Sequence, residues 1–229
     1  MSKLMKSGKT KDLYLNDDGT YTFFLKDDAT GKDGVFDPGE NQVGLSIPGL
    51  GRESLRLTTY FFKLLEREDV PTCFVKSDLD NVSMTVEYAE LFGNGLEFIC
   101  RRLAGGSFLR RYGEYSKKGD YLNFLVEVTL KNDASGDPLI TCDSLVELGI
   151  MSLHTYEKCK TLTKRATKII TKDLASMGLD LADIKFEFGK VGKNIVMIDE
   201  ISAGSMRVYK QGRLLPPMEL AKILLDKET

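Results

Sequence analysis

The sequence predicts an α+β protein, because strand-like and helix-like patterns both occur along its 229 residues. Apolar and polar residues alternate over 183–189 and again over 195–202, which is typical of strands with one face in a core. Gly192 lies between these runs and predicts a turn, so the two strands should form an antiparallel hairpin. Apolar residues at helical spacing predict long helices over 52–69 and 152–177. The length suits one large domain or two small lobes around a cleft.

Two carboxylates share the polar face of this hairpin. If the pairing centres on Lys193, Glu187 lies opposite Asp199. Directly opposed carboxylates repel each other, and a cation between them would relieve the repulsion. Mg²⁺ suits such a site, since it takes one or two carboxylates together with substrate phosphates. The alternative is an exposed polar face on an ordinary hairpin, and the pattern alone leaves both open.

The composition excludes several classes of protein. The net charge is −2, which gives no basic surface for nucleic acid or for a membrane. No apolar run approaches the roughly 18 residues of a membrane span, and the first residues lack the apolar core of a signal peptide. We therefore expect a cytoplasmic protein that binds neither nucleic acid nor a membrane.

Cysteine and histidine are scarce. The four cysteines are widely spaced with no C-x-x-C pair, which argues against a zinc site and a disulfide framework and predicts that most are buried free thiols. His154 is the single histidine, so a histidine-rich metal site is excluded. Any chemistry must use lysine, arginine and carboxylate side chains.

The first half of the chain predicts strands, one long loop and one helix. Residues 20–26 alternate and are rich in strand formers. Glycines and prolines over 27–51 predict an irregular loop, which is either a flap over a cleft or a disordered segment. The helix over 52–69 carries one apolar stripe and belongs to the core. Further strands are predicted over 81–87 and 96–102, joined through a glycine-rich turn.

The second half predicts one strand and three helices. The strand covers 124–130 and is followed by a polar turn. Asp143 is the predicted N-cap of a short helix that ends at Gly149. The helix over 152–177 should stop at Gly178, and Pro216-Pro217 opens the final helix.

Residues 202–207, after the hairpin, are predicted as a turn that projects Arg207 outside both strands. Its planar guanidinium could bind a phosphate there through two N–H groups. The alternative is a surface arginine that pairs with Glu200 or Asp199.

Two glycine-containing basic segments are candidate anion sites. In the first, a glycine between lysines lets backbone N–H groups approach a phosphate. In the second, adjacent arginines precede two glycines and a serine. Ordinary surface turns would have the same composition, so that alternative stays open. The candidate residues are Gly8, Lys9, Lys11, Arg101, Arg102 and Ser107.

Four short motifs, unspecific singly, occur in one order over nearly the whole chain. They are Gly8-Lys9-Thr10-Lys11-x-x-Tyr14, Arg101-x-x-Ala104-x-Gly106-Ser107, Lys131-Asn132-Asp133-x-x-x-Asp137-Pro138, and Asp183-x-Lys185-x-Glu187-Phe188-Gly189 with Asp199-Glu200-x-Ser202. In this order and spacing they resemble the SAICAR synthetase (phosphoribosylaminoimidazole-succinocarboxamide synthase) family of purine-biosynthesis ligases.

The resemblance implies an ATP-dependent amide-forming ligase. Such an enzyme joins L-aspartate to the carboxylate of carboxyaminoimidazole ribonucleotide through an acyl phosphate and yields SAICAR, ADP and phosphate. The implied fold is two-lobed and similar to ATP-grasp enzymes and kinases, with ATP in the cleft between the lobes. The small antiparallel β lobe would cover 1–100 and the larger α+β lobe 101–229. ATP and Mg²⁺ are the implied cofactors, and a homodimer is the suggested assembly.

The same resemblance assigns roles to individual residues. The nucleotide site would use Gly8, Lys9, Thr10, Lys11 and Glu97. Glu187 and Asp199 would hold Mg²⁺ beside the nucleotide. The ribonucleotide phosphate would meet Arg101, Ser107 and Arg207, and the reacting imidazole end would meet Asp183 and Lys185 as the catalytic pair. The remaining residues around the substrates would be Asp33, Lys131 and Asp137.

The chain departs from the family pattern beside the ribonucleotide site. Arg102 replaces a usual asparagine, Ala203-Gly204 replaces a proline and an aspartate, and Tyr209 replaces a tryptophan. A usual Lys-Lys pair is missing from 83–90. Two alternatives therefore stay open: a ligase of the same fold acting on a different amine or ribotide carboxylate, and a non-catalytic nucleotide-binding protein.

Overall fold

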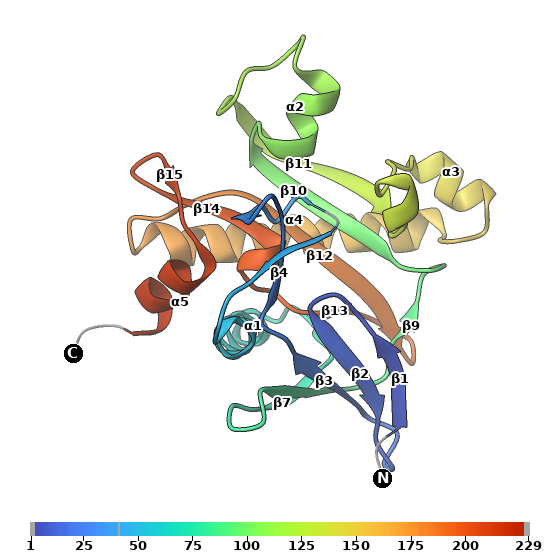
Figure 1. Cartoon of the computed structure of the whole chain (residues 1–229). Coiled ribbons are helices and arrows are strands. Elements are labelled where there is room, and N and C mark those ends of the chain that lie inside the picture. Colours follow the sequence, from blue (N-terminus) through green and yellow to red (C-terminus); the bar gives the residue numbers. More distant parts are fainter. Residues whose placement is uncertain (1–2, 41, 227–229) are drawn as a thin grey trace.

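The computed structural model describes residues 3–40 and 42–226 and confirms the mixed α+β class (Figure 1). Fifteen strands and five α-helices are assigned in the described residues. The strands are β1 (Lys3–Ser7), β2 (Lys11–Leu15), β3 (Tyr21–Leu25), β4 (Asp28–Lys32), β5 (Val35–Phe36), β6 (Val43–Ser46), β7 (Phe74–Asp78), β8 (Ser83–Val86), β9 (Glu90–Leu91), β10 (Leu96–Leu103), β11 (Tyr121–Leu130), β12 (Asp180–Val191), β13 (Asn194–Ile198), β14 (Met206–Lys210) and β15 (Arg213–Leu214). The helices are α1 (Leu50–Arg67), α2 (Gly106–Tyr112), α3 (Cys142–Glu147), α4 (Leu153–Ala175) and α5 (Pro217–Leu225).

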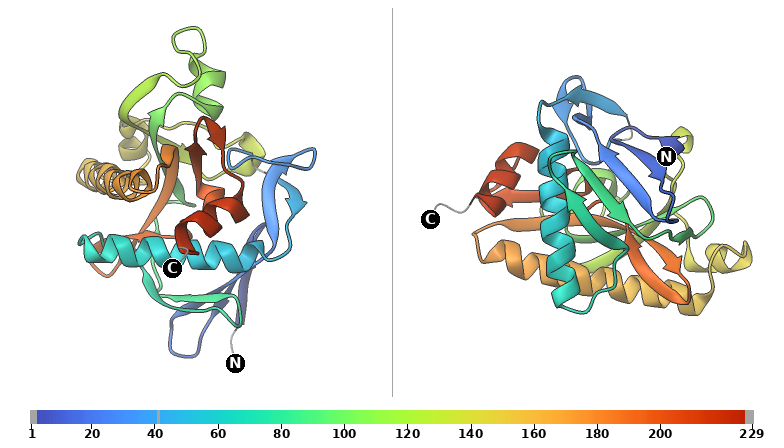
Figure 2. Two further views of the ribbon diagram at one scale, coloured as in Figure 1. Left: turned by 90° about the vertical axis from the view of Figure 1, so that its left-hand side faces the viewer. Right: turned by 90° about the horizontal axis from the view of Figure 1, so that it is seen from below.

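Two antiparallel sheets make the body of the structure. One has five strands in the order β1-β2-β3-β8-β7. The other, the central sheet, has the order β11-β10-β12-β14-β15, and β9 and β13 pair with β12 beyond this path. Helix α4 packs on β10, β11 and β12, and α1 packs on β3 and β7 (Figure 2). Because β8 belongs to one sheet and β10 to the other, the two strands predicted over 81–87 and 96–102 do not pair.

Apolar residues alternate along strand β12, which places one face of this central strand in the core. Ile184, Phe186 and Phe188 are each at most 2% exposed and join the hydrophobic core. Phe188 meets Phe98 of β10 edge to face at 5.3 Å between ring centroids. The alternate residues of β12 therefore share the opposite face, as the sequence predicts.

The predicted register of the hairpin is wrong. Glu187 pairs with Ile198, because β12 and β13 are joined by a two-residue turn and Val191 pairs with Asn194. Asp199 follows the last strand residue and takes the left-handed conformation, with φ at 68°. The two carboxylates therefore come together around the end of β13 and do not face each other across the ladder.

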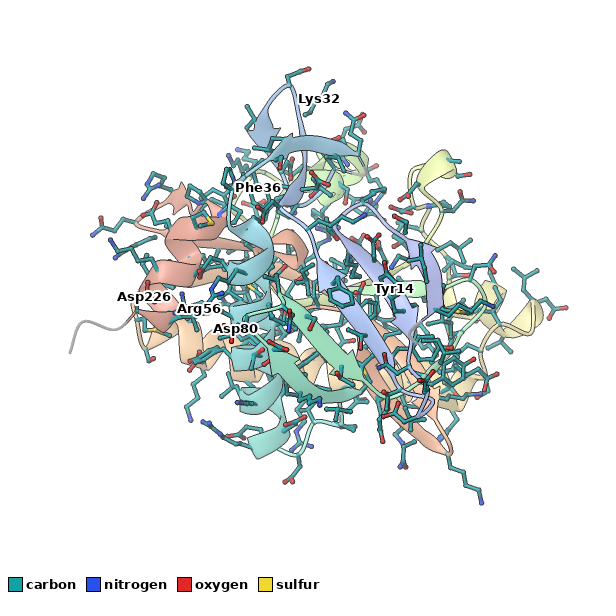
Figure 3. The ribbon with its side chains drawn as sticks, turned by 60° about the horizontal axis from the view of Figure 1, so that its bottom comes forward. Tyr14, Lys32, Phe36, Arg56, Asp80 and Asp226 are labelled. Carbon is teal, nitrogen blue, oxygen red and sulfur yellow. The ribbon has the colours of Figure 1, made fainter. Side chains whose placement is uncertain are left out.

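A small three-stranded sheet, order β5-β4-β6, occupies the segment predicted as irregular. We call β4, β5, β6 and the described residues between them the flap. Gly44 lies so close to Gly31 that a Cβ on Gly44 would come within 2.3 Å of the Gly31 carbonyl carbon, which explains a glycine at this position. Figure 3 shows Lys32 at the free end of the flap and Phe36 nearer the rest of the chain.

The helix ends follow their capping residues. Ser152 caps α4 by accepting from Thr155 N, and Gly178 lies beyond its end with φ at 70°, as predicted. Thr141, not Asp143, caps α3, because its hydroxyl accepts from Ser144 N. Arg56 in the first half of α1 pairs with Asp226 at the end of α5, with 2.6 Å between Nη2 and Oδ1 (Figure 3).

Three further observations concern the predictions from composition. All four cysteines are free, and Cys73, Cys100 and Cys159 are buried, as expected. Among the described helices, none combines the length and apolar character of a membrane span. The predicted division at residue 100 falls inside β10, and the two-domain organisation stays a prediction.

Candidate active site

A cavity of about 950 Å³ lies between the five-stranded sheet, the flap and the central sheet. This volume is at the upper end of the range for small-molecule sites. Every predicted site residue except Asp33 and Arg102 lines it. These are Gly8, Lys9, Thr10, Lys11, Glu97, Arg101, Ser107, Lys131, Asp137, Asp183, Lys185, Glu187, Asp199 and Arg207.

Lysines and carboxylates alternate around one end of the cavity. Lys131 Nζ lies 2.5 Å from Glu187 Oε1 and 3.6 Å from Asp199 Oδ2. Lys11 forms ion pairs with Asp199 and with Glu200, the next residue along the chain. These contacts bring the first loop of the five-stranded sheet against the end of β13.

A third lysine extends the cluster along the central sheet. Lys185 Nζ lies 2.8 Å from Glu97 Oε1 and 3.8 Å from Glu187 Oε1. Glu97 is held from the other side by the Thr129 hydroxyl at 3.0 Å. The cluster thus contains three ammonium groups and four carboxylates, namely Lys11, Lys131 and Lys185 with Glu97, Glu187, Asp199 and Glu200.

Burial and the neighbouring charges shift the pKa values of the acids in this cluster unequally. Burial, and then the Asp199 carboxylate, raise the pKa of Glu187 to about 7. Burial and Asp199 likewise raise the pKa of Glu200. Burial would also raise the pKa of Asp199, but the Lys11 and Lys131 ammonium groups outweigh it and hold that pKa well below its usual range.

The neighbouring carboxylates raise the pKa values of the lysines. Burial disfavours the charged form of Lys131, but Asp199 and Glu187 outweigh this effect and raise its pKa. Burial likewise acts against Lys185, and Glu97 and Glu187 raise its pKa above the usual value. Burial also acts against the charged form of Lys11, and Asp199 and Glu200 raise its pKa. All three ammonium groups therefore remain protonated and can bind phosphate oxygens.

The cluster also fits a divalent cation. Asp199 Oδ1 is buried, and the cation beside it is the Lys11 ammonium. Glu187 supplies a second hard oxygen donor, and a cation would relieve the repulsion that raises its pKa. Among the described residues, no group of three or more histidine, cysteine, aspartate or glutamate side chains is arranged to hold a metal. A cation here would accordingly need further oxygen ligands from a bound molecule.

Arg101 organises the opposite end of the cavity. Its side chain is buried, with Nε donating to Glu127 at 2.6 Å and Nη1 to Asp183 at 3.1 Å. Its Nη2 donates to the Ser107 hydroxyl at 2.9 Å, and Arg111 donates to the same Glu127 oxygen at 2.6 Å. Because three of its donors already have partners, Arg101 fixes the positions of Asp183 and Ser107.

Arg207 lies in β14, directly opposite Asp183 of β12. The prediction that it projects from a turn outside the strands is therefore wrong. Its Nη1 donates to Asp183 at 2.9 Å and its Nη2 to Asp37 of the flap at 2.9 Å. Neither Glu200 nor Asp199, the partners expected for a surface arginine, holds it.

Comparison with known proteins identifies the family of this chain. The family model described as SAICAR synthetase matches residues 4–229. The chain belongs to the SAICAR synthetase family. A phosphoribosylaminoimidazole-succinocarboxamide synthase from Clostridium tetani is 50% identical over 221 residues, which cover 96% of this chain and 97% of that one.

Solved structures of SAICAR synthetases share the fold. One, a SAICAR synthetase in complex with ADP, is 29% identical with a TM-score of 0.81, covering 98% of this chain and 91% of that chain. Another, from Pyrococcus horikoshii, is 28% identical with a TM-score of 0.75, covering 100% of this chain and 92% of that chain.

Two departures from the SAICAR synthetase pattern have clear structural places. Arg102 does not line the cavity; it donates to Leu181 O at 2.8 Å and lies over the Phe124 ring, so it takes no part in an anion cradle with Arg101. The Ala203-Gly204 turn is a short 3₁₀ helix closed by a capping box between Ser202 and Ser205. Reciprocal serine contacts thus stabilise this turn without the usual proline and aspartate.

The structure also reveals residues that sequence reasoning missed. Asp33 lies in the exposed turn between β4 and β5, away from the cavity lining, and Asp37 is the flap carboxylate that pairs with Arg207. Glu127 forms ion pairs with Arg101 and Arg111, and Glu200 forms one with Lys11. Glu200 had a sequence signal, since it follows Asp199 directly within the fourth motif. Asp133, within the third motif, pairs with Lys9 at 2.7 Å.

Proposed function

We propose that this protein is an ATP-dependent ligase that joins L-aspartate to carboxyaminoimidazole ribonucleotide. One observation carries the proposal: in a member of the SAICAR synthetase family, one cavity holds a lysine and carboxylate cluster at one end and an arginine cluster at the other. The first end suits a nucleoside triphosphate, and the second end suits a phosphorylated sugar. A carboxylate and an amine must meet between them.

ATP would lie with its phosphates at the lysine end. Lys9, Lys11 and Lys131 supply cations there, and Gly8 brings backbone close to the phosphates. The solved relative in complex with ADP supports nucleotide binding by this fold. The five-stranded sheet would then act as the smaller, nucleotide-binding lobe of an ATP-grasp or kinase-like arrangement, and the central sheet with α3, α4 and α5 as the larger one.

Glu187 and Asp199 would hold Mg²⁺ beside those phosphates. When bound, the ion neutralises phosphate charge during transfer and orients the γ-phosphate. The buried Asp199 oxygen, which already has a cation beside it in Lys11, and the raised pKa of Glu187 support the assignment. Lys131, which pairs with both carboxylates, would turn toward the phosphates in the loaded enzyme.

The reaction proceeds in two steps that need no histidine. A carboxylate oxygen of the ribonucleotide attacks the γ-phosphorus, ADP leaves, and an acyl phosphate forms. The amine of aspartate then attacks the acyl carbon, phosphate leaves, and the amine loses its proton as the amide forms. Lys185, held by Glu97, is placed to bind the reacting carboxylate, and Asp183 with Arg207 to orient the ribonucleotide.

A coupled assay tests the function. The purified protein should release ADP only when ATP, Mg²⁺, aspartate and the ribonucleotide are all present. ADP release that is independent of aspartate would contradict the proposal. Glutamate and asparagine in place of aspartate test the rival ligase, which the 50% identical relative does not favour. The homodimer and the cytoplasmic location stay predictions.

A further inference from the structure

Asp37 ties the flap to Arg207. Its Oδ1 accepts from Arg207 Nη2 at 2.9 Å, while Arg207 Nη1 donates to both oxygens of Asp183, at 3.2 and 2.9 Å. Asp183 is the neighbour of Arg207 in the β12–β14 ladder, whereas Asp37 reaches it from another sheet. The guanidinium therefore holds one carboxylate of its own sheet and one from the flap.

The two carboxylates differ in how firmly they are held. The Asp183 side chain is 5% exposed and that of Asp37 is 41% exposed. Asp183 also accepts from Arg101, so its departure would leave buried charges without partners. Water stabilises a half-exposed carboxylate after its ion pair opens. Asp37 is accordingly the partner that another anion can replace.

The surroundings of Arg207 link Asp37 to the backbone of the flap. A Cβ on Gly39 would lie 2.2 Å from Arg207 Nη2, and a Cβ on Gly106 would lie 2.8 Å from the same atom. Backbone therefore packs against the guanidinium from the flap and from the start of α2, without side chains. Gly39 N also donates to Asp37 Oδ1 at 2.8 Å. The hydrogen bond from Gly39 N therefore links release of Asp37 from Arg207 to movement of the turn that contains Gly39.

We propose that Asp37 is an internal anion that occupies Arg207 in the ligand-free protein and gives way to the phosphate of the incoming ribonucleotide. The proposal rests on the proposed function, in which Arg207 is the phosphate ligand. A phosphate monoester carries more negative charge at pH 7 than one carboxylate and offers three acceptor oxygens, so it displaces Asp37 where an unphosphorylated nucleoside does not. Asp37 thereby determines specificity for the phosphorylated substrate and couples its binding to release of the flap turn.

Calorimetric titration with ribose 5-phosphate tests the exchange of anions. Asp37→Asn keeps a hydrogen-bond acceptor for Arg207 but removes the competing charge. It should bind ribose 5-phosphate about tenfold more tightly than the wild type, with the affinity for ATP unchanged. Asp37→Ala should also bind ribose 5-phosphate more tightly than the wild type. Asp80→Asn removes the same charge from the exposed β7–β8 turn and should match the wild type.

Hydrogen exchange over residues 28–40 tests the coupling to the flap. Ribose 5-phosphate should accelerate exchange there in the wild type, whereas Asp37→Asn should exchange fast with or without it. Unchanged or weaker ribose 5-phosphate binding in Asp37→Asn would overturn the inference, and so would a complete lack of binding in both proteins. Aspartate-dependent ADP release by the wild type tests the proposed function separately. If that release is absent while Asp37→Asn still binds ribose 5-phosphate more tightly, the inference holds and the choice of substrate is wrong.

Discussion

Glu187 of β12 and Asp199 at the end of β13 share the ammonium of Lys131, at 2.5 and 3.6 Å. Their closeness does not come from ladder pairing, because Ile198 takes the position opposite Glu187. The positive φ of Asp199 directs the chain so that both carboxylates line the same end of the cavity. This relationship underlies the first two predictions.

Glu187→Gln and Asp199→Asn should each abolish turnover while leaving the fold intact. Each change removes one hard oxygen anion, which should weaken Mg²⁺ binding and misplace the γ-phosphate. Steady-state ADP release at saturating Mg²⁺ and a circular dichroism spectrum check both parts. Glu147→Gln, on the exposed side of α3, is the matched control and should keep wild-type activity. Wild-type turnover in either site variant would refute the metal assignment.

The stability effect of Glu187→Gln should depend on pH. The pKa of Glu187 rises from 4.5 to about 7 on folding, so the folded protein binds this proton more tightly than the unfolded chain does. The stability that this carboxyl contributes therefore falls as the pH rises from about 4.5 to about 7, and the loss is complete above that window. Glutamine does not titrate. The Tm of the variant minus that of the wild type should increase from pH 5 to pH 7 and then level off, without nucleotide or metal. A Tm difference that does not change with pH would contradict the raised pKa of Glu187.

Arg101→Met should destabilise the fold. The substitution leaves Glu127 and Asp183 buried without their shared guanidinium. Breaking a buried ion pair costs about 3–5 kcal/mol, which for a chain of this size lowers the Tm by roughly 10 °C. Urea denaturation measures the loss. Arg110→Met, at an exposed position of the same segment, should change the free energy of unfolding by less than about 0.5 kcal/mol.

Arg207→Lys should raise the KM for the ribonucleotide about tenfold to a hundredfold and leave the KM for ATP nearly unchanged. Lysine cannot bind a phosphate through two N–H groups of a planar head, and a charge-assisted contact is worth about 1.5–3 kcal/mol. Initial rates with each substrate varied in turn separate the two constants. A change in the ribonucleotide KM of less than about threefold would show that the phosphate is held elsewhere.

Gly106→Ala should weaken ribonucleotide binding by displacing Arg207. A Cβ at Gly106 would stand 2.8–2.9 Å from the guanidinium atoms, and the φ of 53° already disfavours a side chain. Gly105 is the matched control, because its backbone is extended and a Cβ there meets no atom within 4 Å. Equal KM values for the two alanine variants would contradict this role of Gly106.

The sequence predicts elements well where one pattern decides them and poorly where distant partners do. Alternation identifies β12, and apolar spacing identifies α1 and α4, since each depends on local residues. The place of Arg207 in β14 depends on pairing with β12, and the burial of Arg101 depends on Glu127, 26 residues away. Asp37 meets Arg207 across 170 residues, so no local signal favours it over Asp33.

Transfer of oxygen from the ribonucleotide carboxylate to phosphate is the most direct test of the proposed chemistry. The ribonucleotide is labelled with ¹⁸O in its carboxylate and incubated with ATP, Mg²⁺, aspartate and the enzyme, and the phosphate is analysed by mass spectrometry. Ligation through an acyl phosphate predicts one labelled oxygen in each phosphate formed and one phosphate for each amide. Unlabelled phosphate, or phosphate formed equally well without aspartate, would contradict the account.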